Sequence, residues 1–138
     1  MRSHPSGLDR YDATEAVQYV GDLPDDYAIA DLYRLADVAV SVPSSDGTPL
    51  SVLESLACGT PVVLSDLPAL REWVQEQQEG LFAPVGDVQA VGTAIVRLVV
   101  DNTLRRELRT NGLALIRQRA DSRVWMARAE EMYRGLIG

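Results

Sequence analysis

Two short apolar runs with a polar, helix-length segment between them constrain the fold of this chain most strongly. The first run covers residues 38–42 and is rich in β-branched side chains, and the second covers residues 61–64 and follows a turn. Short continuous apolar runs bounded by turn residues are typical of buried parallel strands. Residues 37–65 therefore predict a strand, a polar loop, a short helix and a second parallel strand.

The helix between the two runs has start and stop residues of its own. Thr48 is a good N-cap, and Pro49 falls at the first helical position, where a missing N–H is tolerated. Gly59 lies where a helix usually ends in a left-handed residue. These residues predict a helix over residues 49–58.

The start of this helix predicts an anion site. A helix that begins where a parallel strand ends presents free backbone N–H groups at the carboxyl edge of the sheet. Such groups bind phosphate and other anions. The backbone amides of Leu50 and Ser51 are the best candidates, because Pro49 has no N–H to donate.

Two carboxylates are expected near the same helix end. Side chains lean toward the N-terminus of a helix, so Glu54 can reach back toward the anion site, and Asp46 lies in the loop before it. Carboxylates accept hydrogen bonds from hydroxyl groups and repel anions. Anion donors and hydroxyl acceptors in one site suit a nucleotide sugar. From spacing alone, the polar stripe of this helix is more typical of a solvent-exposed face than of a binding site; it comprises Ser51, Glu54, Ser55 and Cys58.

A family resemblance favours the binding interpretation. The string D-G-T-P-L-S-V-L-E, residues 46–54, resembles the E-x7-E motif of GT-B glycosyltransferases, especially the retaining family 4. The continuation S-L-A-C-G-T-P-V-V is similar to that family's E-A-M-A-x-G-x-P-V-V. Two positions depart from the pattern, since Asp46 replaces the first Glu and Thr48-Pro49 stands where many members have Phe-Gly.

The resemblance implies a donor-binding role for this stretch. Glu54 would bind the ribose hydroxyls and Asp46 the hydroxyls of the donor sugar, while backbone amides cradle the diphosphate. It implies no metal and no cofactor, the nucleotide-diphosphate sugar being the substrate, and it assigns no certain catalytic residue to this chain. The predicted donor-binding residues are Asp46, Gly47, Thr48, Leu50, Ser51 and Glu54.

Two further segments give candidate base or cleft contacts. Residues 17–23, V-Q-Y-V-G-D-L, resemble the family's V-x-F-x-G-x-V, which lies beside the nucleotide base, so Gly21 is a candidate base contact. The alternative is an ordinary turn after a strand over residues 17–20. The loop containing Arg71 and Glu72 is similar to the family segment after the second strand, and we expect Arg71 to pair with a nearby carboxylate rather than with phosphate.

The remaining patterns predict alternating helices and strands. Strands separated by helices, without hairpin signals, indicate a parallel sheet with right-handed crossovers. The predicted fold is α/β, a Rossmann-like doubly wound sheet with C-terminal helices, after a loose lead-in over residues 1–16. One more strand is expected over residues 80–84. Helices are expected over residues 25–36 and from Asp87, Asp101 and Ser122 onward, and the helix from Asp101 is expected to be interrupted near residues 111–112.

The resemblance covers only the later part of a GT-B enzyme. Residues 17–138 would form a partial C-terminal domain for the nucleotide sugar. The family's N-terminal domain has no counterpart here, nor do the first two strands of the C-terminal domain, which carry the basic residues that grip the diphosphate. We therefore expect a gap in the sheet, filled by different pairing, by another chain or by the rest of a longer gene product. The chain alone is predicted to be inactive, with self-association through the incomplete sheet as a further expectation.

Composition excludes several other classes. A net charge of −7 argues against a nucleic-acid partner. No apolar run is long enough for a membrane span and the N-terminus lacks the apolar core of a signal peptide, so a cytoplasmic location is expected. Cys58 is the single cysteine, so no internal disulfide or cysteine zinc cluster can form.

Three alternative functions remain at this stage. The first is an inactive nucleotide-binding or protein-interaction module derived from such a domain. The second is a GT-B-like nucleotide-sugar epimerase, which the Asp46–Glu54 string fits poorly. The third is a response-regulator receiver, which would need a lysine that this chain does not contain.

Overall fold

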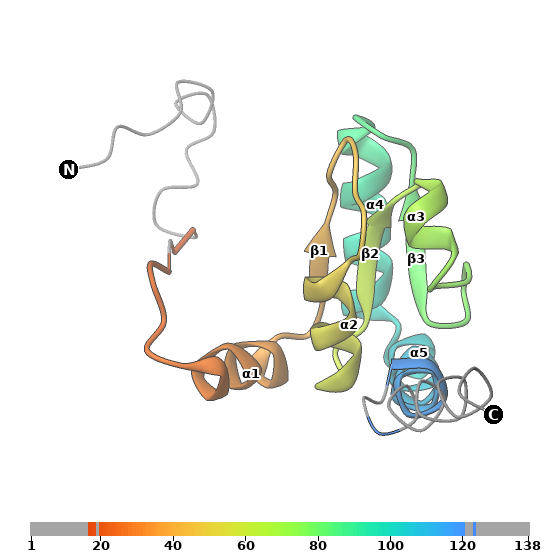
Figure 1. Cartoon of the computed structure of the whole chain (residues 1–138). Coiled ribbons are helices and arrows are strands. Elements are labelled where there is room, and N and C mark those ends of the chain that lie inside the picture. The colour runs from red at the N-terminus through yellow and green to blue at the C-terminus, as the bar shows by residue number, and fades with distance from the viewer. Residues whose placement is uncertain (1–16, 19, 121–122, 124–138) are drawn as a thin grey trace, which may run out of the picture.

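The computed structural model describes residues 17, 18, 20–120 and 123, and its centre is an open parallel sheet (Figure 1). The strands lie in the order β1-β2-β3, with Val40 opposite Val63 and Val63 opposite Leu81. This confirms the predicted α/β fold with parallel strands. The strands are β1 (Ala39–Ser41), β2 (Val62–Ser65) and β3 (Gly80–Ala83).

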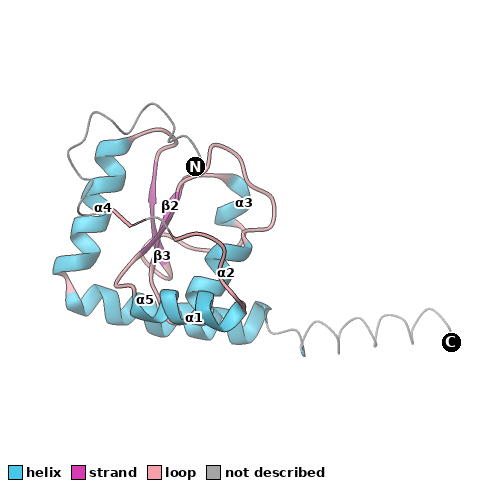
Figure 2. Cartoon of the chain, turned by 90° about the vertical axis from the view of Figure 1, so that its left-hand side faces the viewer, coloured by secondary structure: helices cyan, strands magenta, loops and turns pink. Residues whose placement is uncertain are grey.

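Helices cover both faces of this sheet. Figure 2 shows α4 on one face and α2 with α3 on the other, while α5 crosses beneath them and contacts α2 and α4. The predicted helix starts at Asp25, Asp87 and Asp101 are confirmed, and each of these aspartates is an N-cap that accepts a first-turn N–H. The helical segments are α1 (Asp26–Leu35), α2 (Leu50–Ala57), α3 (Pro68–Arg71), α4 (Val88–Val100), α5 (Asn102–Leu115) and the π-helical turn η2 (Ile116–Ala120).

The core has two halves because β2 is buried on both of its faces. Successive side chains of a strand point to opposite faces. Val62 and Leu64 therefore pack against α2 and α3, whereas Val63 packs against α4 and α5. Burial on both sides explains why β2 reads as a continuous apolar run rather than an alternating one.

The predicted strand over residues 17–20 is wrong. The described residues of this segment are irregular, and Val17 and Val20 are each about half exposed, at 49% and 52%. An extended segment becomes a strand only when a neighbouring strand accepts and donates its backbone hydrogen bonds. None of the described strands lies against this segment.

The predicted helix over residues 49–58 is confirmed, but its cap is not Thr48. Pro49 occupies the N-cap position without a side-chain bond, and Leu50 N–H turns back to Thr48 O at 2.9 Å. At the other end Gly59 has φ of 78°, which is the left-handed conformation expected there.

The predicted break near residues 111–112 is also wrong. The helix α5 continues through Gly112 because this glycine is buried against α2. A Cβ atom at Gly112 would lie 2.8 Å from Leu56 Cδ2, so the missing side chain permits close helix packing instead of ending the helix.

Two predictions lie outside the described residues, namely the lead-in over residues 1–16 and the final helix from Ser122. Within the described part, no helix is both long and apolar enough to cross a membrane.

Candidate functional site at the carboxyl edge of the sheet

The loop that leaves the carboxyl end of β1 holds the first group of predicted site residues. Asp46, Gly47 and Thr48 are all exposed in this loop. Asp46 Oδ1 accepts a hydrogen bond from Gly47 N–H at 2.7 Å. The carboxylate therefore already binds one backbone amide of the loop.

The start of α2 presents free amides, but not the pair that the sequence predicts. Leu50 N–H is taken by Thr48 O, so Leu50 is not a free donor in this structure. The first helical bond runs from Leu53 N–H to Pro49 O at 3.0 Å. The N–H groups of Ser51 and Val52 come before this first helical bond in the chain, and neither has an acceptor among the described residues. At this helix end the unbonded amides are therefore those of Ser51, which is exposed, and Val52, which is only 1% exposed, and the Leu50 amide is not among them.

Glu54 is exposed on the same helix, as predicted. Among the residues that the structure describes, no hydrogen bond or ion pair reaches its carboxylate. The polar stripe is narrower than predicted, because Ser55 is only 1% exposed and its hydroxyl donates to Thr60 O at 3.0 Å. Glu54 and Ser51 thus form the open polar surface near the start of α2, while Ser55 is part of the core.

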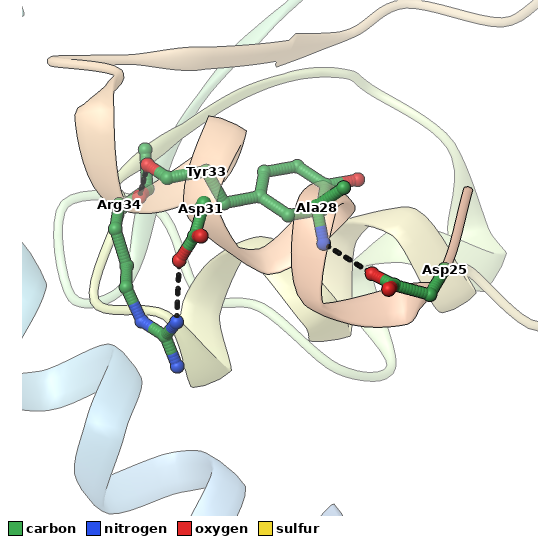
Figure 3. Close-up of polar contacts among 6 residues, drawn as sticks. Asp25, Ala28, Asp31, Tyr33 and Arg34 are labelled. Carbon is green, nitrogen blue, oxygen red and sulfur yellow. Dashed lines mark hydrogen bonds and ion pairs between the residues drawn. The ribbon is translucent and has the colours of Figure 1, made fainter. Parts of the chain in front are cut away.

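Tyr33, on the neighbouring helix α1, is not among the predicted site residues. It belongs to α1, which packs against α2, and Figure 3 shows its ring projecting along the flank of α1. Burial raises the pKa of the Tyr33 phenol, and the nearby Glu54 carboxylate and Cys58 thiol raise it further. Tyr33 and Glu54 lie on two helices that pack against each other.

Arg71 is held by a carboxylate, as the sequence predicted. Its guanidinium pairs with Asp66 through two hydrogen bonds, of which Nη2 to Oδ2 measures 3.0 Å. Its Cζ also lies 4.4 Å from the ring centre of Phe82. The hydrogen bond from Arg71 holds the pKa of Asp66 below its ordinary value. Arg71 is therefore a structural partner of Asp66 at the carboxyl end of β2.

The other two candidate contacts are not joined to α2 by any described interaction. Gly21 is exposed in the irregular segment before α1, with open space around its Cα. Glu72 is exposed at the end of α3, and its backbone carbonyl accepts a hydrogen bond from Arg119 Nη1 at 2.9 Å. The predicted donor-binding residues therefore lie together in the loop after β1 and in the adjoining helix α2. Gly21, Arg71 and Glu72 lie in other segments.

A surface hollow lies elsewhere on the sheet. It has a volume of about 420 Å³ and lies between β3 and α4, where Glu76, Phe82 and Arg97 are among its lining residues. None of the predicted site residues lines it. In the described part of the chain, no group of three or more His, Cys, Asp or Glu side chains could hold a metal ion.

Comparison with known proteins identifies the family. Residues 3–101 match the family described as glycosyl transferases group 1. The chain belongs to this family. The match covers most of the described residues, including the β1 loop, α2 and all three strands.

Individual proteins show similarity to this chain as well. A phosphatidyl-myo-inositol mannosyltransferase of Mycobacterium leprae is 32% identical over 120 residues, which is 86% of this chain and 30% of that protein. A sucrose-phosphate synthase structure from Thermosynechococcus elongatus superimposes with a TM-score of 0.87 at 28% identity, covering 94% of this chain and 32% of that chain. The Anabaena protein HepE, solved in complex with UDP, has a TM-score of 0.72 at 20% identity, covering 75% and 29%.

These alignments confirm the GT-B, Rossmann-like fold of this group 1 glycosyltransferase chain. The chain spans about a third of the length of the mannosyltransferase and of the sucrose-phosphate synthase that it matches.

Proposed function

We propose that this chain is the donor-binding part of a retaining glycosyltransferase of family 4, with the nucleotide sugar bound at the start of α2. In this site Glu54 accepts hydrogen bonds from the ribose hydroxyls and Asp46 from the hydroxyls of the donor sugar. Gly47 and Thr48 line the loop beside them. The backbone amides of Ser51 and Val52 bind the diphosphate.

One observation carries the proposal. An exposed carboxylate without a described protein partner, Glu54, stands on the same helix end as the free Ser51 N–H. Hydroxyl groups need such an acceptor and a diphosphate needs such donors. The positive end of the helix dipole adds to the attraction for the diphosphate. The string from Asp46 to Glu54 functions in this proposal as the E-x7-E motif, with an aspartate in its first position.

The relatives suggest a class of substrate. Mannosyltransferases and a sucrose-phosphate synthase are among the similar proteins, and a structural neighbour was solved with UDP. A nucleoside-diphosphate sugar as donor is consistent with all of these names. UDP is the first nucleotide to test, with GDP and ADP beside it.

Transfer of the sugar needs more than this chain in our proposal. Stabilisation of the leaving diphosphate is the main electrostatic task of such a reaction. In the described site only backbone amides could stabilise the diphosphate, because Arg71 is paired with Asp66 and the chain has no lysine. The N-terminal domain or another chain would supply the basic residues and the acceptor. We expect no metal or cofactor, and a cytoplasmic location.

A second candidate function is a nucleotide-binding or protein-interaction module without turnover. The observation that favours it is the outer edge of β1, where Val40 is 46% exposed and no described strand is paired. An unpaired strand edge is a natural docking surface for another strand.

Calorimetric titration with UDP, GDP and ADP tests the proposal. We expect one nucleotide to bind, and Glu54→Ala to weaken it by about 1–3 kcal/mol, the cost of hydrogen bonds to a charged group. Glu107→Ala on α5 is the matched control, because Glu107 is another exposed helical glutamate and lies outside the site. Equal affinity in the Glu54 variant would remove this residue from the site, and no binding by a folded chain would favour the module.

A further inference from the structure

We propose that the hollow between β3 and α4 is a second binding site, which takes a neutral saccharide through its hydroxyl groups. The hollow has a volume of about 420 Å³, within the range of about 300–1,000 Å³ that is common for small-molecule sites. Its helix α4 lies on the opposite face of the sheet from α2 (Figure 2). The inference therefore goes beyond the proposed function and does not rest on it.

The floor of the hollow is apolar and belongs to the core. Leu81 of β3 and Ala94 of α4 line it and are only 3% and 9% exposed. Both pack in the half of the core that lies between the sheet, α4 and α5. A floor of this kind packs against the C–H groups on one face of a sugar ring and removes them from water.

Two carboxylates on the rim are each held in place by one of their oxygens. Glu76 Oε2 accepts a hydrogen bond from Phe82 N–H at 2.8 Å, and Asp87 Oδ1 accepts one from Ala90 N–H at 2.9 Å. The other oxygen of each carboxylate has no donor among the described residues. Each side chain is therefore fixed while it keeps an acceptor for a ligand, which lowers the entropy cost of binding.

A row of polar side chains along α4 forms the rest of the rim. Gln89, Thr93 and Arg97 are four residues apart, so they lie on one face of the helix. The Thr93 hydroxyl donates to Gln89 O at 2.9 Å and keeps its own oxygen as an acceptor. In the described part of the chain, neither the Gln89 amide nor the Arg97 guanidinium has a hydrogen-bond or ion-pair partner. The row thus offers donors beside the carboxylate acceptors.

The charges of the rim favour a neutral ligand. Its two carboxylates and one guanidinium give a net charge of −1, which repels phosphates and carboxylates. Arg97 in turn disfavours a cation. A hydroxyl group both donates and accepts hydrogen bonds, so a ligand with several adjacent hydroxyls can use the carboxylates, the amide and the guanidinium together. A neutral saccharide has this chemistry, and a nucleotide does not share its charge.

Amide chemical shifts of the whole chain test the proposal. The neutral probes are methyl α-glucoside, methyl α-mannoside and maltose, and the charged probes are glucuronate and inorganic phosphate. The central variant is Arg97→Ala. Arg109→Ala is its matched control, because Arg109 is also an exposed helical arginine without a described hydrogen bond and lies outside the hollow. Glu76→Gln removes the charge but keeps an oxygen for Phe82 N–H.

We expect at least one neutral probe to shift the amides of residues 89, 93 and 97, with smaller changes for the charged probes. Arg97→Ala should weaken this binding by about tenfold, the scale of hydrogen bonds to a charged group, and Glu76→Gln should also weaken it. Arg109→Ala should leave it unchanged.

Three results would overturn the proposal. They are no shift at the hollow with any of the three neutral probes, larger shifts there with glucuronate or phosphate, and equal weakening by Arg97→Ala and Arg109→Ala. Titration with UDP, GDP or ADP bears on the proposed function alone, so the two can fail separately.

Discussion

At the residue scale, Asp66 and Arg71 give the chain a pH dependence that can be measured apart from ligand binding. Both side chains are solvent-exposed, and their hydrogen bonds lower the pKa of Asp66 from its ordinary value of 3.8. A carboxyl group whose pKa is lower in the folded state contributes stability above its ordinary pKa. That contribution disappears as the pH falls through the lowered folded-state pKa.

We therefore predict that Asp66→Asn lowers the melting temperature slightly at pH 7 and not at all near the acid limit of the folded state. The effect is small because exposed ion pairs contribute little. Thermal melts of both proteins between pH 7 and the lowest pH at which they stay folded measure it. A difference in melting temperature that is the same at every pH would contradict the assignment to this ion pair.

The residues of the candidate site were only partly predictable. Asp46 and Glu54 could be found from side-chain chemistry and helix spacing, and the structure places both on the predicted loop and helix. Loss of the Leu50 amide could not be foreseen, because it follows from the local turn that returns Leu50 N–H to Thr48 O. Tyr33 could not be found either, since the packing of α1 against α2 is a tertiary contact that local sequence does not predict.

At the element scale, two helical glycines should respond in opposite directions to the same substitution. A Cβ atom added at Gly92 in α4 would have no other atom within 4 Å, so Gly92→Ala should stabilise the chain by about 1 kcal/mol through helix propensity. In α5, a Cβ at Gly112 would lie 2.8 Å from Leu56 Cδ2, an atom of a side chain that is 1% exposed.

Gly112→Ala should therefore destabilise the chain, because an overpacking cost of up to about 3 kcal/mol exceeds the gain in helix propensity of about 1 kcal/mol. Urea unfolding of the two variants and the unsubstituted chain gives the order of stability. The predicted order is Gly92→Ala first, the unsubstituted chain second and Gly112→Ala last. A Gly112 variant as stable as the Gly92 variant would show that α2 and α5 are not closely packed.

The elements themselves were largely predictable, and the failures share a cause. Asp25, Asp87 and Asp101 mark helix starts through local capping, which depends on a few adjacent residues. The predictions for Gly112 and for residues 17–20 were wrong because both conformations depend on contacts with residues far away in the sequence. A glycine can permit close packing in place of a break, and an apolar run stays irregular where no strand pairs with it.

At the scale of the whole molecule, the two edges of the sheet differ. The outer edge of β3 is closed, since Glu76 Oε2 accepts from Phe82 N–H at 2.8 Å and Gly80 O accepts from Gln77 N–H at 2.9 Å. At β1, Ala39 N–H bonds to Pro61 O on the side of β2, so Val40 N–H points outward. No described residue accepts a hydrogen bond from it. Self-association of the chain stays a prediction, and the outer edge of β1 is the surface where we expect it.

Val40→Lys tests that location, because a charged side chain on an exposed edge blocks strand pairing. We predict concentration-dependent association of the unsubstituted chain in sedimentation velocity and its loss in this variant. Val96→Lys on α4 is the control, since Val96 is 60% exposed and lies away from the strands. Equal loss of association in both variants would point to general apolar contact instead of the β1 edge.

Binding of a nucleotide at the start of α2 is tested most directly by the amide chemical shifts of the chain during titration with UDP, GDP or ADP. We predict the largest shift changes at Gly47, Ser51 and Val52, with small changes at Thr93 and Arg97 beside the hollow between β3 and α4. The largest changes at that hollow, with Ser51 and Val52 unaffected, would contradict nucleotide binding at α2.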